Sequence, residues 1–97
     1  MGLDRAAVIA ALDVVEREGW DGATGRGLLE QVRCAVVEPV VARLARRGPA
    51  ADQAMATGWA TAWEILNGPQ AREADNPAGL VWVAVRRAVL RDLKGSV

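Results

Sequence analysis

Four cationic side chains near the carboxyl end are the residues best suited to contact an anionic partner. From residue 77 onward the chain has one acid, Asp92, and four bases: Arg86, Arg87, Arg91 and Lys94. The last three bases are spaced by four and three residues, so a helix places them on one stripe. Such a stripe can bind DNA phosphates. The alternative is a solvated face that complements the negative carboxyl end of its helix.

Trp82 is the only aromatic residue in the same segment. An accessible indole can stack on an unpaired base, which gives Trp82 a possible role in DNA binding. Trp82 also shares helical spacing with Val85 and Val89, and this pattern favours a place in the core. Trp59 and Trp63 follow a similar apolar pattern, and we expect both to be buried.

A second candidate surface is small and apolar, and it could bind a protein partner. It comprises Ala54, Met55 and Gly58, whose short side chains would let another helix approach closely. Trp20 lies in a glycine-rich stretch and could cover either the bundle or a partner. The alternative for the small residues is packing against another helix of the same chain.

Several kinds of chemistry are excluded by composition. The chain has no His, which removes His-based acid–base catalysis, Ser-His-Asp and Cys-His sites, and the usual mixed zinc sites. Its one cysteine, Cys34, allows no internal disulfide and suits a reducing cytoplasm. Because Cys34 lies among helical valines, we expect it to be buried and inert. We expect no enzymatic activity, no cofactor and no bound metal.

Length and charge suit one small globular domain. The chain has 97 residues, of which 52% are hydrophobic and 25% charged, and 12 bases balance 12 acids. That composition is globular, and the length leaves room for one core. We see no secretory signal pattern and no apolar run that could span a membrane. A cytoplasmic protein without membrane contact is expected, and zero net charge means that any DNA contact is local and weak.

The apolar spacing and the positions of glycine and proline predict an all-α bundle of four to five helices. Residues 1–20 form an amino-terminal helix capped by Asp4 and stopped by Gly19, and residues 19–27 form a loop. The remaining helices are predicted at 27–48 with a kink or break at Pro39, at 49–67, and at 77–94 after a loop over 67–77. The predicted core residues are Leu28, Val32, Val36, Leu44, Trp59, Trp63, Leu66, Trp82, Val85 and Val89.

Residues 50–66 read AADQAMATGWATAWEIL and resemble the second conserved region of bacterial sigma factors, particularly the extracytoplasmic-function type. That family typically reads D-A-E-D-L-x-Q-E-x-F-L-R-A-W-x-x-L, so that Trp59 matches its Phe and Ala62-Trp63 its A-W pair. The flanking segments LLEQVRCAVVEPVVARLARRGP and NPAGLVWVAVRRAVLRDL resemble the helices on either side. Trp82 falls there on a Tyr and Arg86 on an Arg. The resemblance covers roughly residues 28–93.

The resemblance implies a bundle over residues 28–94, within a single domain of residues 1–97, that docks on RNA polymerase and helps to open promoter DNA. The chain departs from the family where polymerase docks, because residues 53–57 read Gln-Ala-Met-Ala-Thr in place of D-L-x-Q-E. It also has Gly79-Leu80-Val81-Trp82 in place of A-W-L-Y. We expect no helix-turn-helix domain of the family within these 97 residues.

Two functions are therefore expected from different classes. The first is a sigma-like, transcription-related domain that binds RNA polymerase, another transcription protein or promoter DNA, weakly or within a larger regulator. The alternative is a small helical interaction module, dimeric or docked on another protein, that has lost sigma activity. The basic stripe, formed by Arg87, Arg91 and Lys94, discriminates between the two functions. If all three side chains are exposed to solvent, DNA binding stays possible. If acidic side chains form ion pairs with them, the interaction module is favoured.

Overall fold

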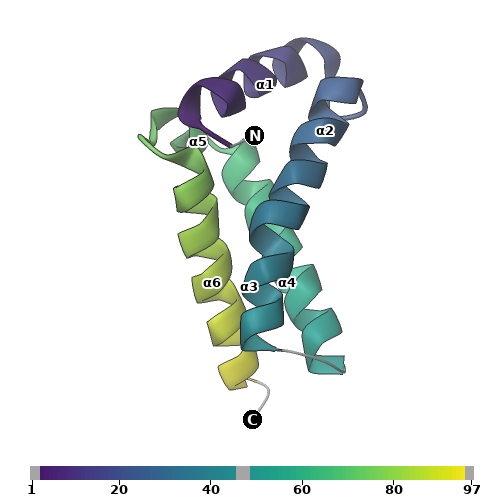
Figure 1. The fold of residues 1–97 in the computed structure, drawn as a ribbon, viewed down its shortest axis with the longest axis vertical. Coiled ribbons are helices and arrows are strands. Elements are labelled where there is room, and N and C mark those ends of the chain that lie inside the picture. Colours follow the sequence, from purple (N-terminus) through teal and green to yellow (C-terminus); the bar gives the residue numbers. More distant parts are fainter. Residues whose placement is uncertain (1–2, 46–48, 96–97) are drawn as a thin grey trace.

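The computed structural model describes residues 3–45 and 49–95, and all regular structure in those ranges is helical (Figure 1). The elements are α1 (Arg5–Glu18), α2 (Ala23–Val32), the π-helical segment η1 (Arg33–Val37), α3 (Glu38–Leu44), α4 (Pro49–Asn67), α5 (Gln70–Glu73) and α6 (Pro77–Gly95). The all-α bundle expected from the sequence is confirmed.

Three rods run along the long axis of this elongated molecule, which measures 42 × 25 × 23 Å. They are the continuous α2–η1–α3 helix, α4 and α6, while α1 crosses one end of the bundle (Figure 1). The pair formed by α4 and α6 has the most extensive packing. None of the described helices is both long enough and apolar enough to cross a bilayer.

Helix α1 begins and ends where the sequence predicts. The backbone N–H of Ala7 donates to Asp4 Oδ1 over 2.8 Å, which satisfies a donor that the first turn leaves free. The helix ends at Gly19, whose φ of 83° lies in a region that suits glycine. Its buried residues Val8, Leu12 and Val15 pack α1 onto the bundle.

Helix α2 begins at Ala23, so the loop predicted over residues 19–27 is wrong and covers only residues 19–22. Gly25 and Gly27, two of the four glycines in the predicted loop, lie within the first turns of the helix. A Cβ built on Gly25 would lie 2.8 Å from the backbone oxygen of Trp20. Gly25 therefore reflects a close approach between the helix and the preceding turn rather than a break.

Pro39 does not break the second rod, because a π-helical turn precedes it. The N–H of Glu38 donates to the carbonyl of Arg33, five residues back, where an α-helix would use the residue four back. This wider turn accommodates a proline that has no N–H and crowds the preceding turn. The helix then continues through Leu44, as predicted. The predicted end at Gly48 lies outside the described residues.

Polar contacts hold α1 against the segment between α4 and α6. That segment, predicted as a loop, contains the short helix α5. Arg72 of α5 pairs with Asp13 of α1 (Nη1–Oδ1 2.6 Å) and with Glu16 (Nη2–Oε1 3.3 Å). The guanidinium of Arg5 donates to the carbonyl of Ala74 over 3.1 Å. Helix α1 is thus part of the bundle, although it lies outside the sigma resemblance.

The core is built mainly from valine, leucine and alanine. The predicted core residues that are buried are Leu28, Val32, Val36, Leu66, Val85 and Val89. Leu44 and Trp59 are partly buried and pack against that core. Trp63 and Trp82 are each 39% exposed, so the prediction that both belong to the core is wrong.

The residue before each exposed tryptophan takes the buried position. Ala62 is 0% exposed and Val81 is 1% exposed. Consecutive residues on a helix point about 100° apart, so an apolar repeat read one residue out of phase selects the wrong side chain. Interior space also matters, because Ala62 and Val81 let α4 and α6 approach more closely than indoles would.

Candidate nucleic-acid interface

The basic residues at the carboxyl end lie on the outer face of α6. Val81, Val85 and Val89 repeat every four residues and are all buried, which fixes the inner face of the helix. The outer face then carries its exposed residues: Trp82, Val83, Arg86, Arg87, Arg91 and Lys94. The sequence placed Trp82 on the inner stripe with Val85 and Val89, whereas the structure places it beside the cations.

The predicted stripe of Arg87, Arg91 and Lys94 faces solvent as a unit. All three side chains are exposed, and none forms an ion pair with any residue in the described ranges 3–45 and 49–95. Their positive charge is therefore not neutralised by those parts of the chain. This is the arrangement that keeps phosphate binding possible.

Arg86 and Trp82 form a contact one helical turn apart on the same face. The guanidinium carbon of Arg86 lies 6.0 Å from the centroid of the Trp82 ring, at the outer range of a cation–π contact. Both side chains are exposed. The pair combines a flat apolar surface with a positive charge, the two features that bind an unpaired nucleotide.

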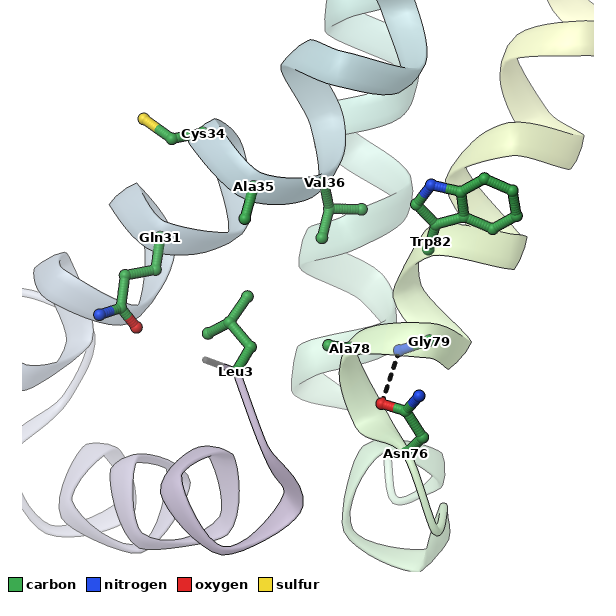
Figure 2. A pocket seen from close by; sticks show the side chains of 9 residues that line it. All are labelled: Leu3, Gln31, Cys34, Ala35, Val36, Asn76, Ala78, Gly79 and Trp82. Carbon is green, nitrogen blue, oxygen red and sulfur yellow. Dashed lines mark hydrogen bonds between the residues drawn. The ribbon is translucent and has the colours of Figure 1, made fainter. Parts of the chain in front are cut away.

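A neutral cleft of about 520 Å³ lies on one side of Trp82, between the start of α6, the α2–η1 rod and the amino-terminal segment (Figure 2). Its lining residues are Leu3, Gln31, Cys34, Ala35, Val36, Asn76, Ala78, Gly79 and Trp82. None of them is charged, and the two amides belong to Gln31 and Asn76. Asn76 also caps α6, because its Oδ1 accepts from the N–H of Gly79 over 3.0 Å.

An arginine cleft of about 450 Å³ lies on the other side of Trp82, between α3 and α6. Its lining residues are Pro39, Val40, Arg43, Leu44, Trp82 and Arg86. Arg43 and Arg86 come from different helices and give this cleft two positive charges and no negative one. Sequence reasoning missed Arg43 as a site residue, because only the tertiary packing brings α3 beside α6.

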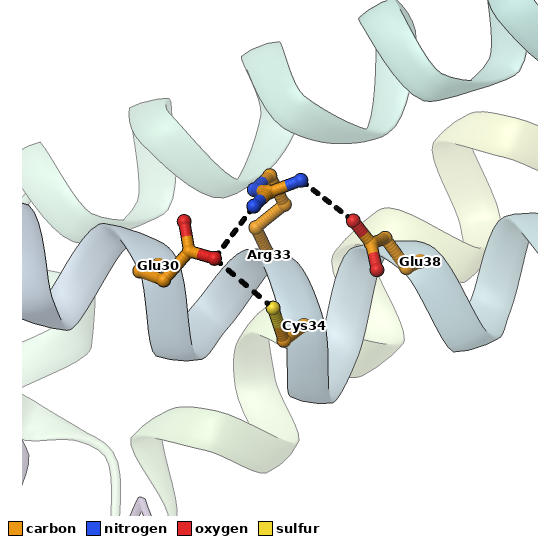
Figure 3. A network of polar contacts seen from close by, with 4 residues as sticks. All are labelled: Glu30, Arg33, Cys34 and Glu38. Carbon is orange, nitrogen blue, oxygen red and sulfur yellow. Dashed lines mark hydrogen bonds and ion pairs between the residues drawn. The ribbon is translucent and has the colours of Figure 1, made fainter.

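A polar network lies at the edge of the neutral cleft (Figure 3). Arg33 contacts Glu30 over 2.6 Å and Glu38 over 2.7 Å, and the thiol of Cys34 donates to Glu30 Oε1 over 3.4 Å. The hydrogen bond from Arg33 lowers the pKa of Glu30. The hydrogen bond to Glu30 raises the pKa of Cys34, so the thiol form is favoured.

Cys34 is exposed, so its predicted burial is wrong. It lies at the second position of the π-helical segment, and the apolar residues that suggested burial point elsewhere. Val32 and Val36 are buried, whereas Cys34 and Ala35 are exposed.

The predicted partner-binding patch does not form a free surface. Ala54 is 0% exposed, and a Cβ on Gly58 would lie 3.2 Å from methyl groups of both Val37 and Val85. Ala54 and Gly58 therefore serve packing within the chain, which was the alternative interpretation. Met55 is half-buried and packs against the core.

Trp20 is also half-buried and covers the bundle. Its ring packs against Trp63, with centroids 5.0 Å apart and planes inclined by 48°. Its Nε1–H donates to Asn67 Oδ1 over 2.9 Å. The predicted DNA-binding residues are all exposed on α6. Trp82 and Arg86 lie on the side that lines the arginine cleft, whereas Arg87, Arg91 and Lys94 form a separate stripe further around the helix. No protein-family model, curated protein or solved structure matches this chain.

Proposed function

We propose that this domain binds nucleic acid through the outer face of α6 in a sigma-like, transcription-related role. The observation that carries the proposal is the position of Trp82, which lines both a neutral cleft and an arginine cleft on the helix that also carries the exposed basic stripe. Phosphates bind Arg87, Arg91 and Lys94 without regard to sequence. With only a few such contacts and no net positive charge, the isolated domain binds weakly.

Trp82 gives the site a preference for unpaired nucleotides. A base stacks on the exposed indole and reaches the neutral cleft, where the amide of Gln31 can meet the donors and acceptors on its edge. The adjoining phosphate lies toward Arg43 and Arg86, the two cations of the arginine cleft.

RNA polymerase, or another transcription protein, supplies the sequence specificity that the isolated domain lacks. In the resemblance, polymerase docks on the helix that corresponds to α4, where this chain has Ala56 and Thr57 in place of Gln and Glu. We propose that sequence specificity comes from such a partner or from a larger regulator. Copurification with RNA polymerase from the native host tests the partner separately from DNA binding.

Anisotropy titrations with labelled single-stranded and duplex oligonucleotides test the base-stacking site. Trp82→Ala should weaken single-strand binding by about five-fold or more, because one base–aromatic stack contributes about 1–3 kcal/mol. Trp63→Ala is a matched control, since Trp63 has the same 39% exposure but lies on α4. Equal losses in the two variants, or a loss with duplex alone, would contradict a stacking role for Trp82.

A further inference from the structure

Trp82 lines two clefts that differ in charge, and this difference sets the direction in which a nucleotide fits. Along α6 the lining residues run from Ala78 and Gly79 in the neutral cleft, through Trp82, to Arg86 in the arginine cleft. Gly79 and Arg86 are seven residues apart, which is about 10 Å along a helix. One nucleotide bridges a distance of this order between the far edge of its base and its phosphate. The two clefts together therefore suit one nucleotide rather than a run of them.

The neutral cleft is bounded at the end that lies away from the arginine cleft. Leu3 and Gln31 line this cleft and also a smaller cavity of about 210 Å³ beside α1, so they lie between the two. Figure 2 shows the Leu3 side chain between the second rod and the first turn of α6. A base that stacks on Trp82 and enters the neutral cleft stops at these side chains. Its sugar and phosphate are left on the side of the arginine cleft.

The arginine cleft has two positive charges that the described parts of the chain do not neutralise. Arg43 and Arg86 are exposed, and neither forms an ion pair within residues 3–45 and 49–95. They come from α3 and α6, so they can contact one anion from two sides. Guanidinium groups bind phosphate oxygens through forked pairs of hydrogen bonds. The cleft is therefore suited to a phosphate group.

The number of charges distinguishes a terminal phosphate from a phosphate within a strand. A phosphodiester has one negative charge, so two arginines exceed it. A phosphomonoester carries a charge of about −1.5 to −2 at pH 7 and has three oxygens that accept hydrogen bonds. The phosphomonoester therefore matches two guanidinium groups in charge and offers them more acceptors.

We propose that the stacking site described above, on which this inference rests, takes a nucleotide that ends in a phosphomonoester. The base stacks on Trp82, and the phosphomonoester lies between Arg43 and Arg86. The same chemistry occurs in a free mononucleotide and at a phosphorylated end of a strand. The basic stripe lies further around α6 and is not part of this site.

Anisotropy titrations of the full chain compare short, internally labelled single strands that carry a 5′-phosphate, a 3′-phosphate or only hydroxyl ends. A phosphorylated end should raise the affinity by about ten-fold, because hydrogen bonds between charged groups are among the strongest. Arg43→Gln should remove that preference. Arg26→Gln removes an equally exposed positive charge from α2 and should keep it. Equal affinities for the three strands, or the same loss of preference in both variants, would overturn the inference.

Adenosine 5′-monophosphate (AMP) distinguishes the two sources of the ligand. The chain has four tryptophans, and AMP should shift the indole N–H resonance of Trp82, assigned with Trp82→Phe, more than adenosine does. Displacement of the phosphorylated strand by AMP at a similar concentration would identify a free nucleotide as the ligand. Displacement only at far higher AMP concentrations would identify a strand end.

The two experiments also separate this inference from the proposed function. Single-strand binding that depends on Trp82 but shows no preference for a phosphorylated end would overturn the inference alone. A response of Trp82 to AMP without any binding of single strands would overturn the proposed function alone. Arg43 is exposed, so Arg43→Gln should fold, as circular dichroism would verify.

Discussion

The guanidinium carbon of Arg86 lies 6.0 Å from the centre of the Trp82 ring, and both side chains line the arginine cleft. This pair joins an aromatic surface to a positive charge where the two clefts meet. Because both side chains are exposed, their removal should affect ligand binding more than folding.

The first prediction separates the roles of two tryptophans. Trp82→Ala should lower the free energy of unfolding by about 1 kcal/mol or less, as is usual for an exposed site. Trp59→Ala should cost about 2–4 kcal/mol, because Trp59 packs against the core. Urea unfolding of the two variants measures both values. A larger loss of unfolding free energy in Trp82→Ala than in Trp59→Ala would show that Trp82 is a core residue.

The second prediction concerns two glycines in the first turns of α2. Gly27→Ala should raise stability by about 0.5–1 kcal/mol, because alanine favours helix and nothing lies within 4 Å of the new Cβ. Gly25→Ala should lower stability, since its Cβ would lie 2.8 Å from the Trp20 backbone oxygen. Thermal melts compare the two. The same effect at both positions would argue for a loop there.

The third prediction concerns the exposed thiol. Cys34 should react slowly with iodoacetamide at neutral pH, because its hydrogen bond to Glu30 raises the pKa of the thiol. Removing that acceptor in Glu30→Ala should shift the pH–rate profile to lower pH and speed alkylation at neutral pH. Glu38→Ala, which removes a carboxylate that acts on Cys34 by charge alone, should shift the profile less. An unchanged profile in Glu30→Ala would show that the hydrogen bond does not control the thiol.

Much of the fold follows from local rules. The caps at Asp4 and Asn76, the first-turn prolines of α4 and α6, and the stop at Gly19 act within a few residues, so the sequence identifies them. Gly25 was assigned to the predicted loop because the sequence does not distinguish a glycine required by close packing from a glycine required by a turn. The π-helical turn before Pro39 depends on how the whole rod packs, and no local pattern specifies it.

The candidate site was only partly accessible to sequence reasoning. The basic stripe of Arg87, Arg91 and Lys94 follows from spacing within one helix. The cleft residues Arg43 and Gln31 come from other helices, and only tertiary packing brings them beside Trp82. The burial of Trp63 was mispredicted because two consecutive apolar residues, Ala62 and Trp63, both fit the helical repeat.

The salt dependence of duplex DNA binding tests the proposed interface most directly. Three or four phosphate contacts predict a slope of about −3 to −4 for log K against log salt concentration. The double reversal Arg87→Glu/Arg91→Glu should abolish binding with little change in melting temperature, because both side chains are exposed. Arg17→Glu/Arg26→Glu changes the net charge equally on exposed sites of α1 and α2, and it should retain most of the affinity. Binding that survives the α6 reversal, or that is lost equally in the control, would contradict a nucleic-acid site on α6.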